Sequence, residues 1–250
     1  MTIDLRNVQH ILDLLIEQLF AEESLAWTRV YSWKLNEGPN THIMLPVVFP
    51  AFMLLHCTRL ITNNPRLDMR RKKICSWLLH QRTQTTSTWN WWQTNVAERK
   101  TRPYPDDLDD TSCALAAIHT VRPEVITGGM LAQFTSVLCQ SEQKSGGPYT
   151  TWLVSAEEKK WHDVDPVVNC NIAYALSLFG VTLDQQIEYL AQVFQTSCAS
   201  PYYPSLLPCA YFFARMFNSV GPLAQEKLEP ARKYVEDIVV SELNSARWNT

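Results

Sequence analysis

The sequence predicts an all-α fold in which buried and half-buried helices alternate. Apolar residues recur with the 3.6-residue spacing of helices, and period-2 stretches bounded by hairpin turns, which would indicate strands, are nearly absent. Alternating helices of these two kinds would form an inner and an outer ring, so we expect one domain over residues 1–250. Nearly all-apolar helices are predicted at 44–61, 109–120, 167–179 and 205–217, and more amphipathic ones at 67–80, 124–140, 183–196 and 223–245.

The first third of the chain adds further expected elements. Apolar residues between Leu5 and Leu19 mark an amphipathic helix, residues 25–33 a second one, and Gly38-Pro39 a loop. The helix at 67–80 begins beside a basic run, which is typical of a solvated face but also suits phosphate or a membrane surface. That run comprises Arg66, Arg70, Arg71, Lys72 and Lys73.

A degenerate repeat runs through the middle of the chain. Gln81, Gln140 and Gln195, spaced 59 and 55 residues apart, each stand at a predicted helix end, before a small or polar loop and an aromatic residue. The spacing corresponds to one helical hairpin. A glutamine side chain there can hydrogen-bond the last carbonyl groups of a helix while the aromatic residue packs across the hairpin.

Composition bounds the class of protein. The chain has 250 residues, 46% apolar content and a net charge of −3, which is enough for a buried core and gives no global attraction to nucleic acid. Its seven cysteines form no Cys-x-x-Cys pair and indicate reduced thiols. The N-terminal segment is not a signal peptide, and the apolar run 45–55 is too short to cross a bilayer. We expect a cytoplasmic protein; peripheral membrane contact is the alternative to a solvated face for the basic run.

Four acids crowd the start of the predicted helix at 109–120. Asp106, Asp107, Asp109 and Asp110 follow two prolines, and one of them suffices to cap the helix. Four anions in one turn repel one another, and burial favours the protonated form, so one member can stay a carboxylic acid near neutral pH. A solvated, capped helix start and a metal site are the other interpretations of the same residues.

The segment Asp107-Leu108-Asp109-Asp110-Thr111 resembles the Asp-x-Asp-Asp-Thr motif of class II terpene cyclases. The repeat likewise resembles the Gln…Trp repeats of the squalene cyclase and prenyltransferase superfamily, which folds as an α/α toroid. This resemblance implies an α/α barrel like the acid-bearing domain of those cyclases. It also implies that Asp109 is the general acid that protonates a double bond of an isoprenoid, with Asp107 and Asp110 tuning it.

A second group of acidic and amide residues follows the second repeat. Asp163 and Asp165-Pro166 lead into an apolar helix that carries Asn169 and Asn171, at a place in the repeat that matches the acid motif. We expect both asparagines to hydrogen-bond and polarise Asp109, although helix contacts would also explain them. Aromatic faces stabilise cations, so the residues expected to line a substrate chamber are Tyr149, Trp152, Trp161, Tyr211 and Phe212. Trp91 and Tyr203 lie in the same aromatic clusters.

The resemblance implies a linear isoprenoid diphosphate substrate, farnesyl or geranylgeranyl diphosphate, whose diphosphate is retained in the product. A Mg²⁺ ion would accompany that diphosphate; no organic cofactor and no metal held by the protein are expected. In familiar class II enzymes the chamber lies between two toroid domains. This chain has residues for one, so either the barrel encloses a small substrate or a second domain, or a second copy in a homo-oligomer, closes it.

Two alternatives stay open at the level of sequence. Asp106, Asp107 and Asp110 also satisfy the Asp-Asp-x-x-Asp pattern of class I terpene synthases, which ionise a diphosphate with Mg²⁺. The second metal-binding element of that class has no counterpart around Asn169. The other alternative is a non-catalytic toroid that binds an apolar ligand or a partner protein.

Overall fold

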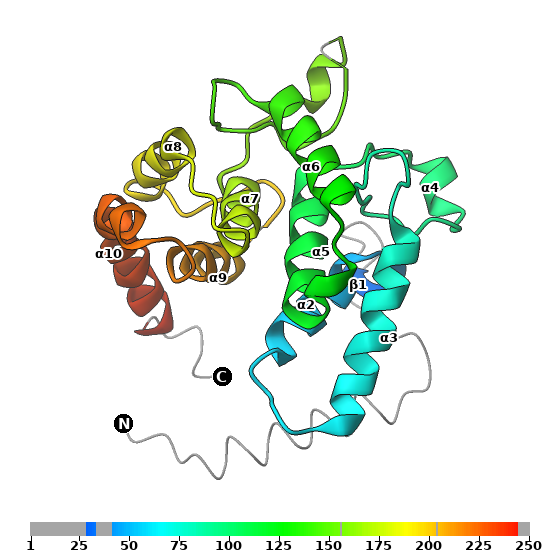
Figure 1. Cartoon of the computed structure of the whole chain (residues 1–250). Coiled ribbons are helices and arrows are strands. Elements are labelled where there is room, and N and C mark those ends of the chain that lie inside the picture. The colour runs from blue at the N-terminus through cyan, green and yellow to red at the C-terminus, as the bar shows by residue number, and fades with distance from the viewer. Residues whose placement is uncertain (1–28, 34–41, 156, 204, 245–250) are drawn as a thin grey trace.

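The computed structural model describes residues 29–33, 42–155, 157–203 and 205–244 (Figure 1). Most of these residues are helical, which confirms the all-α prediction at that level. The α-helices are α2 (Phe49–Thr58), α3 (Pro65–Gln81), α4 (Glu98–Thr101), α5 (Leu108–Val121), α6 (Gly128–Ser141), α7 (Pro166–Leu178), α8 (Asp184–Phe194), α9 (Leu206–Phe217) and α10 (Pro222–Asn244). Short 3₁₀ turns are η2 (Pro123–Val125) and η3 (Lys159–Trp161).

A β-hairpin corrects two of the predicted helices. Strands β1 (Arg29–Trp33) and β2 (His42–Pro46) pair antiparallel, so the helix expected at 25–33 is wrong where the structure describes it. The helix expected at 44–61 begins only at Phe49. β-branched and aromatic residues in these runs favour strands, and prolines mark the junction, one ending β2 and one in the first turn of α2. The helix and loop predicted at 5–19 and 36–40 lie outside the described residues.

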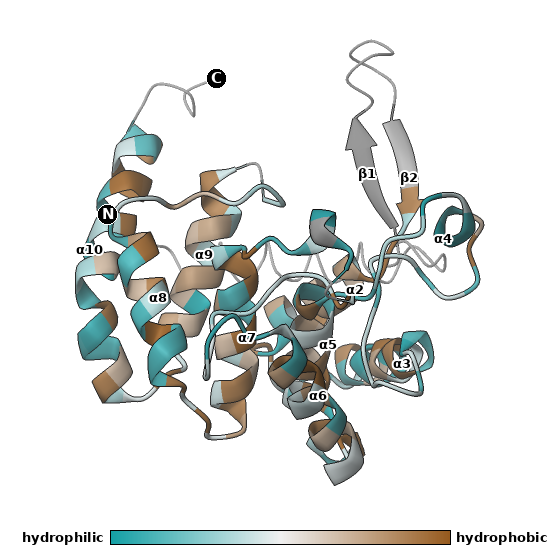
Figure 2. Ribbon diagram, turned by 90° about the horizontal axis from the view of Figure 1, so that it is seen from above, coloured by the Kyte–Doolittle hydropathy of each residue, from teal (hydrophilic) through white to brown (hydrophobic). Residues whose placement is uncertain are grey.

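The helices predicted to be apolar pack next to one another. Helix α5 contacts α2 and α7, and α7 contacts α9, which gives the row α2–α5–α7–α9. The amphipathic helices pack on this row: α3 lies on α2 and α5, α8 on α7, and α10 on α8 and α9. In Figure 2 the outer helices α8 and α10 carry both hydrophilic and hydrophobic residues, as expected for helices with one face on a core.

The hydrophobic core has two parts that meet at the central pair α5 and α7. One part joins α2, α3, α5 and α6, and the other joins α7, α8, α9 and α10. Helix α7 contributes Val168 and Ile172 to the first part and Cys170 and Tyr174 to the second. Because α5 and α7 are buried on nearly every side, polar groups near their starts are also withdrawn from water.

Side-chain caps fix where the helices begin. Asn64 accepts from the N–H of Leu67 at the start of α3, and Thr127 accepts from Met130 in α6. The two central helices use aspartates, Asp107 for α5 and Asp165 for α7. None of the helices that the structure describes is both long and apolar enough to cross a bilayer.

Candidate functional site

The acid motif is held by an extended segment that ends at the start of α5. Asp107 pairs in β-bridges with Trp89 on one side and Trp152 on the other. The N–H of Leu108 donates to the carbonyl of Thr151 at 2.8 Å, which ties this segment to the loop after α6. Successive side chains of an extended chain point to opposite sides, so Asp106 and Asp107 face different parts of the molecule.

Asp107 and Asp110 form the buried start of α5. The Asp107 carboxylate accepts from the N–H of Asp110 at 2.7 Å, which makes it the helix cap. Both side chains are almost fully buried, and one Asp110 oxygen has no hydrogen-bond partner in the structure. Burial raises the pKa of Asp107 well above its usual value, and the charges of Asp110 and Asp109 raise it further. The pKa of Asp110 is raised for the same two reasons, first burial and then the charge of Asp109.

Asp109 has donors on both carboxylate oxygens. The Tyr203 hydroxyl donates to Oδ2 at 2.5 Å, and Nδ2 of Asn171 donates to Oδ1 at 2.6 Å. Burial raises the pKa of Asp109, whereas these two donors and the positive charge of Arg215 act to lower it. Burial has the larger effect on the pKa, so Asp109 keeps its proton to a higher pH than an exposed aspartate does. Once the proton is lost, the hydrogen bonds from Tyr203 and Asn171 stabilise the carboxylate that remains.

An aromatic cavity of about 640 Å³ lies against these acids. Its lining includes Asp107, Asp109, Asp110, Phe49, Trp91, Tyr104, Trp152, Trp161, Tyr202, Tyr203 and Lys160. The Trp152 and Trp161 rings lie 4.7 Å apart, and Nε1 of Trp152 donates to the Tyr202 hydroxyl at 2.7 Å. The lining therefore combines an acid with several aromatic faces, which can stabilise a positive charge in an apolar space.

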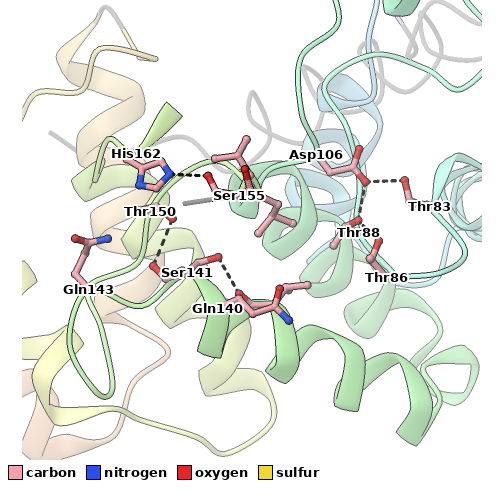
Figure 3. Close-up of a pocket in the computed structure, with 13 residues that line it drawn as sticks. Thr83, Thr86, Thr88, Asp106, Gln140, Ser141, Gln143, Thr150, Ser155 and His162 are labelled. Atoms are coloured by element: carbon pink, nitrogen blue, oxygen red, sulfur yellow. Dashed lines mark hydrogen bonds between the residues drawn. The ribbon is translucent and has the colours of Figure 1, made fainter. Parts of the chain in front are cut away.

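Asp106 belongs to a separate, polar pocket of about 480 Å³ (Figure 3). Thr83 and Thr88 both donate hydroxyl hydrogen bonds of 2.6 Å to one of its oxygens, and Asn90 donates to the other at 3.1 Å. Arg99 forms an ion pair with it at 3.4 Å. The Asp106 carboxylate is thus satisfied on the opposite side of the segment, and it does not line the aromatic cavity with Asp107 and Asp110.

The two asparagines of α7 have different partners. Asn171 bonds Asp109, as described above. Asn169, by contrast, accepts from the Tyr149 N–H at 2.9 Å and donates to the carbonyls of Tyr149 and Asp165 at 3.0 and 2.9 Å. The expectation that Asn169 polarises Asp109 is therefore corrected: it joins the loop after α6 to the start of α7. Residues two apart on a helix point in different directions, which explains the difference.

The predicted aromatic residues also separate into two groups. Trp152 and Trp161 line the cavity. Tyr149 is buried in the core part formed by α2, α3, α5 and α6 and is not among the lining residues. Phe212 lies behind the lining, with its ring 5.0 Å from that of Tyr203, and Tyr211 is partly exposed, 6.0 Å from the His56 ring. These three positions differ from the expected chamber lining.

Sequence reasoning missed two groups that act on Asp109. Tyr203 was expected in the lining, but its role as a hydrogen-bond donor to Asp109 depends on a contact between residues 94 positions apart. Arg215 is a buried arginine in α9, where it donates to Asn171. A signal for it was present, since an arginine within the apolar run Leu206–Phe217 is unusual.

Comparisons with known proteins give no match, whether to protein-family models, to curated proteins or to solved structures. In the part of the chain that the structure describes, no group of three or more His, Cys, Asp or Glu residues is arranged to hold a metal ion.

Proposed function

We propose that this protein is a class II terpene cyclase that acts on a linear isoprenoid diphosphate, with Asp109 as the general acid. The observation that carries the proposal is the position of Asp109: its carboxyl group lines an aromatic cavity, its pKa is raised by burial, and Tyr203 and Asn171 hold both of its oxygens. The α/α toroid expected from the sequence is part of the same proposal, supported by the row α2–α5–α7–α9 and the outer helices packed on it.

The reaction begins with proton transfer from Asp109 to the terminal double bond of the substrate. The O–H bond of the acid breaks, a C–H bond forms with the π electrons of the alkene, and the neighbouring carbon becomes a cation. The next double bond attacks that cation and closes a ring, and loss of a proton to a base ends the sequence. The diphosphate stays on the product because no carbon–oxygen bond breaks.

Each group near Asp109 has a part in this chemistry. Tyr203 and Asn171 stabilise the carboxylate as charge develops on it, which makes proton donation easier. Trp152 and Trp161 present π faces to a cavity that holds the cation away from water. Asp107 and Asp110 stay protonated to a higher pH than exposed aspartates do, because burial and the neighbouring carboxylates raise their pKa values.

Among the described residues that line the cavity, Lys160 is the one cation available to a substrate diphosphate. Lys160 lies at the cavity with its ammonium group 4.5 Å from the Trp161 ring centre. Asp106 faces the other pocket, and the described acids at the cavity are not arranged as a group that would hold Mg²⁺. We expect Mg²⁺ only as a counter-ion carried with the diphosphate.

The test is incubation with farnesyl or geranylgeranyl diphosphate, followed by enzymatic dephosphorylation and mass spectrometry. A cyclic alcohol should form with the wild type and vanish in Asp109→Asn, which keeps the size of the side chain and its place on α5. Lys100→Ala and Asp184→Asn, which change charges away from the cavity, should retain the product. Unreacted substrate with the folded wild type would reject the proposal.

The same assay separates the two alternatives. A class I enzyme would release inorganic diphosphate, and the opposite orientations of Asp106 and Asp107 argue against that chemistry. A non-catalytic binding protein would retain the isoprenoid without converting it. The inward position of Asp109 favours the cyclase over a binding protein, because a purely apolar ligand gains nothing from a carboxyl group in its cavity.

A further inference from the structure

Arg215 carries a buried positive charge that none of the described carboxylates contacts. The residue is 8% exposed, and its Nε has no hydrogen-bond partner among the residues that the structure describes. Among the described residues its polar contacts are neutral: it donates to Oδ1 of Asn171 at 2.6 Å and to Sγ of Cys113 at 3.5 Å. The rings of Tyr174 and Phe212 lie 4.4 and 4.8 Å from the guanidinium carbon.

A buried guanidinium destabilises the fold unless a negative charge lies near it. An uncompensated buried ion is destabilising by several kcal/mol, so buried arginines are normally paired with acids. The thiol of Cys113 does not provide a negative charge, because burial raises its pKa to about 12. His56 adds no positive charge either, because burial, followed by the charge of Arg215, lowers its pKa to about 3.

The amide of Asn171 connects Arg215 to Asp109. Its NH₂ group donates to Asp109 and its oxygen accepts from Arg215, so the amide dipole is oriented along the line from cation to acid. The reverse orientation would place NH₂ against a guanidinium that can only donate. The three side chains come from α5, α7 and α9, three neighbouring helices of the inner row.

We propose that Arg215 is a positioning residue that acts on Asp109 through Asn171 and stabilises the carboxylate formed when Asp109 donates its proton. The inference rests on the proposed function for its catalytic meaning. Before proton transfer no carboxylate in the described part of the chain contacts the buried arginine, and after the transfer Asp109 supplies a negative charge that Asn171 links to it. The attraction between Arg215 and Asp109 therefore grows as charge develops on the carboxylate, so it stabilises the transition state of proton transfer more than the ground state and increases the rate.

Several other titratable groups lie near Asp109 and Arg215. Asp107 and Asp110 lie on the same helix as Asp109, Asp165 at the start of α7, and Tyr203 just before α9; Cys113, Tyr174, Tyr211 and His56 surround Arg215. The variants separate the charge at position 215 from its hydrogen-bond donors. Arg215→Gln removes the charge and keeps an amide donor, Arg215→Met removes both, and Arg215→Lys keeps the charge. Arg232→Met, on the exposed side of α10, is the control.

The measurement is the titration of Asp109 by ¹³C NMR of labelled carboxyl groups, with the Asp109 signal identified by its loss in Asp109→Asn. Arg215→Gln and Arg215→Met should raise the pKa of Asp109 by about one unit, because an opposite charge near an acid lowers its pKa by about that much. Arg215→Lys should raise it less, and Arg232→Met should leave it unchanged. In the cyclisation assay, kcat should fall by up to about tenfold in the neutral variants with KM unchanged.

An Asp109 titration that does not change in either neutral variant would overturn the inference, as would a kcat loss without a pKa change, since a structural role alone would give that result. Two neutral variants of different shape keep the test decisive if one of them fails to fold. The titration needs no turnover. A shifted titration without cyclase activity would therefore reject the proposed function and keep the coupling, and activity with an unshifted titration would reject only the coupling.

Discussion

Removing one hydroxyl group tests how Asp109 is tuned. In Tyr203→Phe the acid loses the 2.5 Å hydrogen bond to its Oδ2, while the aromatic ring can keep its packing against Phe49 and Phe212, at 6.1 and 5.0 Å between ring centres. The change is small in volume and lies at the cavity wall, so we expect the fold to persist. The effect should therefore be confined to the chemistry of the acid.

The magnitude follows from the strength of a hydrogen bond to a charged group. Such a bond contributes about 1.5–3 kcal/mol, and one pKa unit corresponds to about 1.36 kcal/mol. Without the hydroxyl, the pKa of Asp109 should rise by about 1–2 units above its already raised value. If the transition state carries most of the carboxylate charge, kcat should fall by roughly 10- to 100-fold. The unfolding free energy should fall by only about 1 kcal/mol.

The assay is the pH dependence of kcat for cyclisation. Because the general acid must be protonated, kcat falls as pH rises through the pKa of Asp109. In Tyr203→Phe this falling limb should move to higher pH while the plateau below it becomes lower. Tyr202→Phe is the matched control, since it removes a neighbouring hydroxyl that bonds Asp163 and Trp152 instead. A folded Tyr203→Phe protein with the kcat and the pH limb of the wild type would refute this account of Asp109.

Three further predictions concern stability. Gly147 and Gly180 both have positive φ, but only a Cβ at Gly147 would lie 2.9 Å from the Tyr149 ring. Gly147→Ala should therefore lower the unfolding free energy in urea by more than the ~1 kcal/mol expected for Gly180→Ala, and equal losses would contradict this steric argument. Asp165→Ala removes the acceptor for two N–H groups of α7 and should cost about 1–2 kcal/mol in the same assay; an unchanged midpoint would show that the cap is dispensable. Burial raises the pKa of Asp110 from 3.8 to about 8, so the folded protein holds this proton more tightly than the unfolded chain does. That contribution is complete below pH 3.8 and is lost as pH rises through about 8, so stability should fall across this range more steeply in the wild type than in Asp110→Asn, and parallel curves would disprove it.

Helix periodicity predicted most of the described fold because it depends on local patterns. The predicted bounds 109–120 and 167–179 differ from α5 and α7 by one residue at each end, since aspartate caps and prolines mark those starts in the sequence. The hairpin was missed because residues 25–33 and 44–46 fit an apolar helical run equally well. Pairing between two strands depends on contacts that a single stretch of sequence does not reveal.

The site was predictable only where its members are close in sequence. Asp107, Asp109 and Asp110 share one helix start, so their crowding is visible in the chain itself. The contact of Tyr203 with Asp109 and the link from Arg215 through Asn171 arise from how α9 and the residues before it pack beside α7, and no local pattern specifies them. The assignment of Asn171 rather than Asn169 likewise depends on the rotation of α7 about its own axis, which periodicity leaves undetermined for a helix buried on nearly every side.

The extended stretch before α5 makes the role of each of its two aspartates depend on its distance from the helix start. Asp106 and Asp107 are chemically identical, and only their alternation between the strand-like partners Trp89 and Trp152 sends one to the threonines and the other to the helix start. Inserting one residue between Asp107 and Leu108 would move Asp107 to the side that faces the threonines and leave the cap position of α5 to the inserted residue. The spacing from the first residue of α5, and not the presence of a carboxylate alone, therefore decides which of the two aspartates caps the helix.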